Sequence, residues 1–299
     1  MRRRISRVLM LGLAVVALTT VALWDRIRLV IDERAVARIK AQRLVQFGLG
    51  LPLPGTPDVD RLEARLSEQG FSLGAPVFIR IFKAESELEV WLRRNGRFER
   101  FSSYPVCRWS GRLGPKLVQG DRQSPEGFYS VGPEQLNPNS RWHRSFNIGF
   151  PNALDRSYRR TGTFLMVHGG CSSVGCYAMT DPVIDEIWRL VTAAFRQGQP
   201  RFQVHAFPFR MTAANMARRK NSPWMPFWQD LKHGYDLFEA DGAPARVMAC
   251  HGHYAFESGD AGVLDAAPLA IGCPAPGRDA IQGIRARAVV GAGDGGVQR

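Results

Sequence analysis

The segment that most constrains the fold of this chain runs from Phe164 to Asp181 and reads FLMVHGGCSSVGCYAMTD. It opens with four apolar residues, as a buried strand does, and continues into a turn rich in glycine and serine. Asp181 and Pro182 then form a good N-cap and first-turn pair for a helix. The sequence therefore predicts a strand, a turn and a helix in succession, with His168 entering the turn and Cys176 within it.

This arrangement has an obvious chemical use. A thiol attacks as a thiolate, and a nearby imidazole can take its proton. Gly175 lets the backbone come close, so amide groups near Cys176 are expected to face a developing oxyanion. The alternative is a buried cysteine and a core histidine beside a glycine turn, because cysteine is among the most buried residue types. A loop between a strand and a helix is where catalytic residues collect, which brings the two interpretations to about even weight.

Two blocks of sequence resemble the L,D-transpeptidase (YkuD-type) family. The first is HGG at 168–170 followed by SVGCYAM at 173–179, and its short spacing and GCYAMTD ending are similar to the YafK-like branch. The second lies upstream, as LGPK at 113–116 and GDRQSPEGFY at 120–129. The resemblance covers roughly Val77 to Phe256. The two blocks in this order are specific, whereas either alone is moderate support.

The resemblance implies a mainly β catalytic domain with flanking helices (α+β), built as a β-sandwich or barrel-like sheet, with a helical C-terminal extension. It implies that Cys176 forms a thioester with peptidoglycan stem peptides, that His168 is its base, and that the backbone around Gly175 forms the oxyanion hole. Within the matching blocks, the residues assigned to substrate binding are Gly169, Ser173, Tyr177 and Lys116.

One position departs from the family pattern. The main branch carries an arginine two residues after the cysteine, where it is thought to help hold the substrate, and this chain has Ala178 there. The outcome therefore stays open between transfer of the acyl group to an amine, which is transpeptidation, and transfer to water, which is hydrolysis. The departure slightly favours hydrolysis, including that of amide links between envelope protein and the wall. Neither outcome requires a metal or an organic cofactor.

Two further properties of the site stay open. His168 needs a group that orients it; a backbone carbonyl or a hydroxyl of Ser172 or Ser173 is available, and no acidic residue is obviously placed for it. If the helix that begins near Pro182 aims its N-terminus at Cys176, its dipole lowers the pKa of the thiol.

Residues 1–24 have the pattern of an export signal. Four arginines stand among the first seven residues, and a nearly continuous apolar run follows them. The length of this run is intermediate between that of the apolar region of a signal peptide and that of a membrane-spanning helix. Its small-residue cleavage site near residues 20–22 is weak. We expect an uncleaved signal anchor rather than a removed signal peptide. The rest of the chain then lies on the periplasmic side of the inner membrane, or free in the periplasm after cleavage.

Charge narrows the set of partners. A formal net charge of +13 over 299 residues indicates an anionic partner, and no nucleic-acid-binding motif is recognisable. With 45% hydrophobic and 22% charged residues, wholesale disorder is excluded. Expected partners are peptidoglycan stem peptides, an envelope protein linked to the wall, and the membrane through the N-terminal segment, but not nucleic acid. The alternative to an enzyme is a non-catalytic peptidoglycan-binding envelope protein.

The odd number of cysteines suits an exported protein that keeps one thiol free. The five are Cys107, Cys171, Cys176, Cys250 and Cys273. Their pairing cannot be deduced. A Cys171–Cys176 disulfide is disfavoured because short loops rarely meet disulfide geometry, and the spacing does not match the C-x-x-C motif of a thiol oxidoreductase. The run Cys250-His251-Gly252-His253 lacks the converging partners that zinc needs, so we predict no metal site.

Periodicity and turn signals divide the chain into five parts. These are a signal segment at 1–24, a helical stalk and linker at 25–75, a catalytic domain at 76–207, an extension at 208–257, and a disordered tail at 258–299. Strands are expected at 77–82, 88–92, 98–106, 127–131, 146–150, 164–167 and 202–207, and helices at 25–46, 58–70 and 182–197. The strand at 77–82 alternates as a half-buried strand does.

Several other polar residues favour structural interpretations. Arg141, His143 and Arg144 precede a predicted strand, and a solvated basic face is more expected there than a site for stem-peptide carboxylates. His205 lies within the last predicted strand and is expected in the core.

Overall fold

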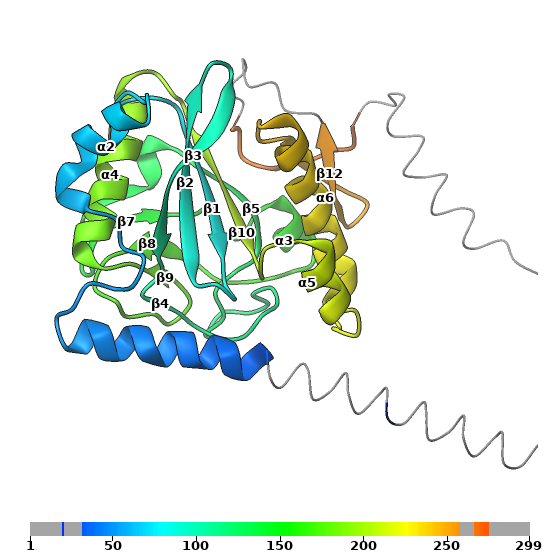
Figure 1. The fold of residues 1–299 in the computed structure, drawn as a ribbon. Helices are drawn as coiled ribbons and strands as arrows, with labels where there is room; N and C mark the ends of the chain where they lie inside the picture. The colour runs from blue at the N-terminus through cyan, green and yellow to red at the C-terminus, as the bar shows by residue number, and fades with distance from the viewer. Residues whose placement is uncertain (1–19, 21–31, 258–265, 275–299) are drawn as a thin grey trace, which may run out of the picture.

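The computed structural model describes residues 20, 32–257 and 266–274, and its core is a pair of five-stranded sheets between layers of helices (Figure 1). The first sheet has the order β3-β2-β1-β10-β5, in which β1 and β10 are parallel and the other neighbours antiparallel. Its strands are β1 (Val77–Phe82), β2 (Glu87–Arg94), β3 (Arg97–Pro105), β5 (Gly127–Val131) and β10 (Phe202–Phe207).

The second sheet has the order β4-β9-β8-β7-β6 and carries the segment on which the sequence analysis centred. Only the β8–β9 pair is parallel. Its strands are β4 (Arg108–Trp109), β6 (Leu136–Ser140), β7 (His143–Asn147), β8 (Met166–His168) and β9 (Tyr177–Ala178). The prediction of a mainly β fold with flanking helices is confirmed, but the sheets pack as layers and do not close into a barrel.

Helices cover both sides of the first sheet. On one side, α4 (Asp181–Arg196) and α2 (Leu62–Glu68) pack with the second sheet over the main core. On the other side, α6 (Met225–Asp241) contributes to a second, aromatic core. The remaining short helices are η1 (Val59–Arg61), η2 (Pro133–Gln135), α3 (Ala153–Ser157) and α5 (Ala213–Arg218).

Burial on both faces changes how β1 should be understood. The sequence predicted a half-buried strand, yet every residue of β1 is buried. Ile79 and Ile81 point into the main core, while Phe82 points into the aromatic core beneath α6. Successive side chains of β1 therefore alternate between two cores rather than between core and solvent, because the extension covers the second face of the sheet.

The extension contains a sheet as well as helices. Strand β11 (Arg246–Cys250) pairs with β12 (His253–Glu257) and, in parallel, with β13 (Ala270–Ile271). The prediction of a disordered tail from residue 258 therefore fails for residues 266–274. A disulfide between Cys250 and Cys273, together with the β11–β13 pairing, holds this segment in place. Neither interaction leaves a periodic apolar pattern in the sequence.

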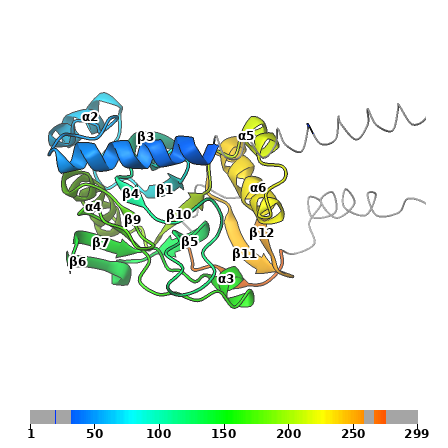
Figure 2. The same ribbon diagram turned by 90° about the horizontal axis from the view of Figure 1, so that it is seen from below.

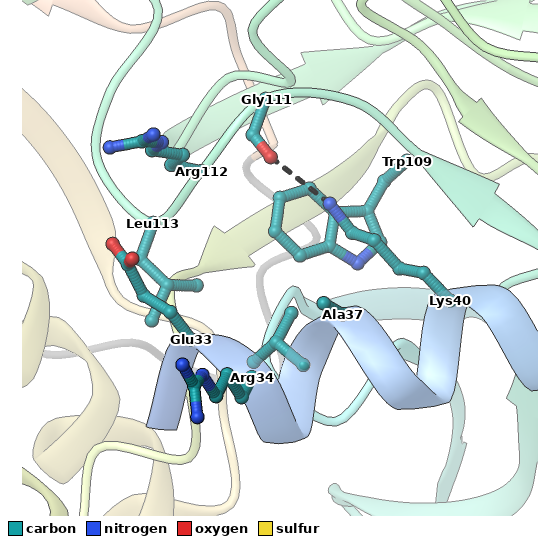
Figure 3. Close-up of a pocket in the computed structure, with 9 residues that line it drawn as sticks. Glu33, Arg34, Ala37, Lys40, Trp109, Gly111, Arg112 and Leu113 are labelled. Atoms are coloured by element: carbon teal, nitrogen blue, oxygen red, sulfur yellow. Dashed lines mark hydrogen bonds between the residues drawn. The ribbon is translucent and has the colours of Figure 1, made fainter. Parts of the chain in front are cut away.

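The expected stalk lies against the catalytic domain. Residues 32–48 form a helix that runs along the end of the sheets nearest β4 (Figure 2). The Arg43 guanidinium donates to the carbonyls of Ser86 and Val106. The Lys40 ammonium lies 3.2 Å from the centroid of the Trp109 ring, at the wall of a pocket of about 380 Å³ (Figure 3). Burial, with Lys83 and Arg108 nearby, lowers the pKa of Lys40 to about 7.

Within the segments that the structure describes, no helix combines the length and the apolar character needed to cross a membrane. Apart from Thr20, the predicted export signal at residues 1–24 lies outside the described residues. The signal anchor stays a prediction.

A buried ion pair joins the two parts of the upstream matching block, at 113–116 and 120–129, to the extension. The Lys83 ammonium donates to Glu126 Oε1 at 2.9 Å and to the carbonyls of Gly114 and Ser124 at 2.9 and 3.0 Å. The Glu126 carboxylate also accepts from the Gly114 amide at 2.7 Å and from Trp228 Nε1 of α6 at 2.9 Å. Both side chains are fully buried, so each depends on the other for its charge compensation.

Replacing Lys83 by methionine should therefore lower the free energy of unfolding by about 3 kcal/mol, because it leaves the Glu126 carboxylate buried without its cation. Urea unfolding of the soluble domain measures the change. The matched control is Lys232→Met, which removes the partly exposed Lys232–Asp236 pair of α6 and should cost no more than about 1 kcal/mol. Equal losses in the two variants would contradict this assignment.

Candidate active site

Parallel pairing of β8 and β9 brings His168 and Cys176 to one face of the second sheet. Val167 pairs with Tyr177 and His168 with Ala178. Cys176 directly precedes β9, so by the two-residue period of a strand its side chain shares the face of Ala178 and His168. Neighbouring strands lie about 4.8 Å apart and rise about 3.3 Å per residue, so the backbones of His168 and Cys176 are roughly 8 Å apart. The register therefore brings the two predicted catalytic residues together.

Cys176 is a free thiol held close to the backbone of β8. The Met166 N–H donates to its Sγ at 3.4 Å, and Sγ donates to the Phe164 carbonyl at 3.6 Å. Burial raises the pKa of the Cys176 thiol, while the Met166 N–H and the Lys116 ammonium act in the opposite direction. A helix dipole that reached the thiol would lower this pKa, as we expected from the sequence. The structure gives the opposite shift because desolvation is the largest effect.

His168 is oriented by a backbone carbonyl, one of the alternatives that the sequence left open. Its Nδ1 lies 2.5 Å from the Gly169 oxygen. A carbonyl only accepts, so Nδ1 carries the proton and Nε2 is left as the basic nitrogen. Burial lowers the pKa of His168, and the Gly169 carbonyl opposes that shift. Within the described part of the chain, no hydrogen bond joins His168 to Cys176.

Gly175 shapes the turn that presents the thiol. Its φ of +126° is one that other residues rarely adopt, and a Cβ there would lie 3.1 Å from Leu165 Cδ1. Its N–H donates to Ser173 Oγ at 3.3 Å. The Gly175 N–H, which was predicted to face an oxyanion, is thus already hydrogen-bonded within the turn. The N–H of Cys176, by contrast, has no hydrogen-bond partner among the described residues.

Two serines bind the backbone of Cys176, and a third serine contacts them. Ser173 and Ser124 both donate to the Cys176 carbonyl, at 2.7 and 3.0 Å. Ser173 Oγ also lies 3.2 Å from Ser110 Oγ. Ser124 and Ser110 were missed by the sequence analysis, although Ser124 stands in the SPEG part of the second matching block. The Ser173 hydroxyl supports the turn, and a direct contact with substrate stays a prediction.

The other predicted substrate-binding residues lie behind the site. Lys116 is buried, and its ammonium is 2.5 Å from Asp121 Oδ1, so it acts on the thiol through its charge. Tyr177 is fully buried and its hydroxyl donates to the Pro125 carbonyl at 2.5 Å. A Cβ on Gly169 would lie 2.4 Å from Asp181 Oδ1. The observed contacts of these residues are structural, and substrate contact stays a prediction.

Exposed apolar side chains surround the cysteine and histidine. Trp142 stacks on the His168 ring, with centroids 6.3 Å apart and planes 30° apart. Phe164 is 72% exposed and Val174 73% exposed. Phe164 was expected in a buried strand, but it has a φ of +57° and precedes β8. Single exposed apolar residues leave no periodic signal, so sequence reasoning could not find this rim.

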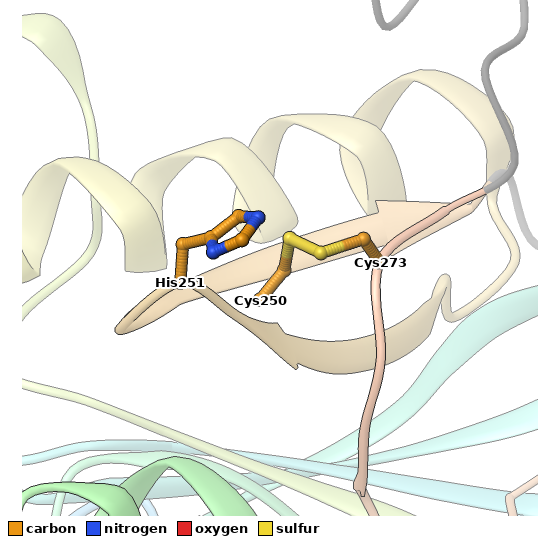
Figure 4. A group of neighbouring side chains, drawn as sticks. All are labelled: Cys250, His251 and Cys273. Carbon is orange, nitrogen blue, oxygen red and sulfur yellow. A yellow bond between two sulfur atoms is a disulfide. The ribbon is translucent and has the colours of Figure 1, made fainter.

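The disulfides settle which cysteine is free. Cys107 pairs with Cys171, which lies in the loop between His168 and Cys176. Cys171 is thus unavailable as a partner of Cys176, which removes the thiol-oxidoreductase alternative in this oxidation state. Near the surface, His251 lies beside the Cys250–Cys273 disulfide (Figure 4). Disulfide sulfurs are not the thiolates that bind metals, so these three residues are not a metal site as they stand.

The remaining polar candidates have structural partners. His143 Nε2 and Arg144 Nε lie 2.8 and 3.1 Å from Asp185 Oδ1 of α4, which agrees with a solvated charged face. His205 is buried between aromatic rings and its Nε2 donates to Gln203 Oε1 at 2.8 Å, as expected for a core histidine.

Comparison with known proteins identifies the class. The chain is 50% identical over 182 residues to proteins named "Putative L,D-transpeptidase YafK" from Escherichia coli K12 and from Escherichia coli O157:H7. The match covers 61% of this chain and 74% of each relative. No family model matches. Because of this similarity, the chain belongs to the L,D-transpeptidase family, as its two sequence blocks predicted.

Solved structures give only partial likenesses. The helical cell shape determining protein Pgp2 (K307A mutant) from Campylobacter jejuni is 19% identical, with a TM-score of 0.38 over 62% of this chain and 66% of that one. Bd1075 from Bdellovibrio bacteriovorus is 17% identical, with a TM-score of 0.33 over 56% of this chain and 62% of that one. Likenesses below a TM-score of 0.5 assign neither fold nor function to this chain.

Alkylation against pH tests the environment of the thiol. Iodoacetamide reacts with the thiolate, so its rate should rise with a midpoint above 9.0, the ordinary value for this group, because burial raises the pKa of Cys176. Lys116→Met should move the midpoint further up by removing the nearby cation, whereas Lys232→Met on α6 should leave it in place. A midpoint below 9.0 in the wild-type protein would contradict this description.

Proposed function

We propose that this chain is a cysteine enzyme of the cell wall that forms a thioester between Cys176 and a stem peptide of peptidoglycan. One observation carries the proposal: the free thiol shares a sheet face with a histidine whose Nδ1 is fixed by the Gly169 carbonyl. The similarity to proteins named L,D-transpeptidase supports a wall peptide as the substrate.

The first half-reaction uses the two residues in fixed roles. His168 Nε2 takes the Sγ proton as the sulfur of Cys176 attacks the carbonyl carbon of the stem peptide. The free N–H of Cys176 is the available donor to the resulting oxyanion. When the tetrahedral intermediate collapses, the carbon–nitrogen bond breaks and the leaving amine takes the proton from His168. The products are an amine and an acyl-enzyme thioester.

Water then resolves the thioester in the outcome that we favour. His168 takes a proton from the water as its oxygen attacks the thioester carbon, and the departing Cys176 sulfur regains a proton. Ala178 supports hydrolysis, because this position is an arginine in the main branch of the family and is here a fully buried alanine. With an amine in place of water, the same acyl-enzyme gives transpeptidation. The amide that links envelope protein to the wall is a substrate of the required chemistry.

The proposed site of action is the periplasmic side of the inner membrane. The apolar run that follows the arginines of residues 1–24 supports export and anchoring. The helix at 32–48 packs directly against the catalytic domain, so an anchor at its N-terminal side would keep the enzyme close to the membrane surface.

Product analysis tests the proposal. Purified wall sacculi and soluble muropeptides are incubated with the wild-type protein and with Cys176→Ala, and the products are separated by chromatography and weighed. We expect shortened stem peptides or released protein with the wild type, and none with Cys176→Ala. New cross-linked dimers in place of cleaved products would assign transpeptidation. Identical patterns for the two proteins, both folded, would favour a non-catalytic wall-binding protein.

The pH profile gives a separate expectation. Proton transfer requires the neutral imidazole, and burial lowers the pKa of His168 below 6.5, its ordinary value. The neutral form therefore persists into more acidic solution than it does for an exposed histidine. The acid limb of kcat/KM should have its midpoint below 6.5, as measured on a muropeptide substrate. A midpoint at or above 6.5 would show that His168 is not held neutral as described.

A further inference from the structure

A groove of about 460 Å³ separates the catalytic domain from the extension. Leu117, Val118 and Tyr158 form one wall, and Trp224 and Phe227 of the extension form the other. Leu117 is 40% and Val118 53% exposed, so apolar surface faces solvent along it. A cavity with aromatic walls and few polar groups is the usual form of a ligand site.

A buried guanidinium, that of Arg160, also lines the groove. Arg160 is only 8% exposed, and its guanidinium carbon lies 5.0 Å from the Tyr158 ring centroid and 4.9 Å from that of Phe227. Its Nη1 donates to Asp155 Oδ1 at 2.8 Å, while its buried Nε has no partner among the described residues. A buried guanidinium usually has its donors satisfied. Arg160 adds positive charge beside the aromatic walls, which Asp155 compensates in part, while its Nε is itself buried.

Charge in the groove favours an anion. Arg159 lines it beside Arg160 and is exposed. The only carboxylate among the described lining residues, Asp230, lies 2.8 Å from His253 Nδ1 and is engaged there. A ligand that places a carboxylate near the two arginines and an apolar side chain on the aromatic walls would complement both features.

Hydrogen bonds connect the groove to the active site. The Leu117 carbonyl accepts from the Thr161 N–H at 3.0 Å, and Gln119 bridges to Thr161 and Thr163 at 3.0 and 3.1 Å. Phe164 follows directly, and its carbonyl accepts from Cys176 Sγ. A peptide that leaves the thiol along this loop would enter the groove at Leu117.

We propose that this groove binds an extended peptide segment carrying a carboxylate and an apolar side chain, as part of the substrate whose carbonyl Cys176 attacks. The groove is thus a second binding site that selects acidic, apolar peptide sequence outside the scissile bond. The link to the substrate rests on the proposed function, whereas peptide binding by the groove does not.

Binding is measured on isotope-labelled Cys176→Ala protein, which forms no thioester. The probes are acetyl-Leu-Phe-Glu-amide and acetyl-Leu-Phe-Gln-amide, which differ only in the side-chain carboxylate. We expect the Glu peptide to shift the Trp224 indole N–H resonance and to bind about fivefold more tightly than the Gln peptide. Arg159→Glu should abolish that preference. The matched control is Arg156→Glu, an exposed arginine outside the groove, which should preserve it.

Equal affinity for the two peptides, shifts mapping away from Trp224, or no binding up to the solubility limit would each overturn the inference. Binding of the wall disaccharide at Trp224, without the peptides, would also overturn it. Val118→Glu is a second exposed variant and should weaken the Glu peptide by charge repulsion. Formation of the thioester is tested separately on wild-type protein. If the thioester forms but the peptides do not bind, peptide binding by the groove is rejected and the proposed function stands. If the peptides bind but no thioester forms, the proposed function is rejected and peptide binding by the groove stands.

Discussion

The arrangement of the site depends on the hydrogen bonds that the buried Glu126 carboxylate accepts. The carboxylate accepts from the Lys83 ammonium directly after β1, the amide of Gly114 and the indole of Trp228, and so ties three parts of the chain to one point. The loop that begins at Gly114 carries Lys116 towards the thiol. The loop that ends at Glu126 carries Ser124 to the Cys176 carbonyl. The compensation of the Glu126 charge in the core thereby helps to fix the positions of Lys116 and Ser124 beside Cys176.

Desolvation gives the site its electrostatic character. Burial raises the pKa of the Cys176 thiol and lowers that of His168, so both groups favour their neutral forms. In the proposed mechanism, the proton therefore moves from Cys176 to His168 only as the sulfur attacks the carbonyl carbon. The Lys116 ammonium and the Met166 N–H oppose the shift of the thiol pKa, and in the proposed mechanism they would stabilise negative charge on sulfur during attack.

Local patterns were enough to predict most elements. The strands predicted at 77–82, 127–131 and 202–207 coincide with β1, β5 and β10, and α4 covers nearly the predicted range of 182–197. Features that depend on distant residues were not predictable. The Cys107–Cys171 disulfide joins residues 64 apart, and the packing of residues 32–48 depends on carbonyls contributed by another part of the chain. At the site, His168 and Cys176 were evident because chemistry restricts their residue types, whereas Ser110 and Trp142 act through position alone.

The most direct test of the account is to isolate the thioester. Wild-type protein is mixed with muropeptides, quenched in acid within seconds and weighed intact, then digested to locate any added mass. The account predicts a gain equal to the acyl part of the stem peptide, located on the peptide that contains Cys176 and removed by hydroxylamine. An unmodified Cys176 throughout turnover, in protein that still changes the wall products, would contradict the account.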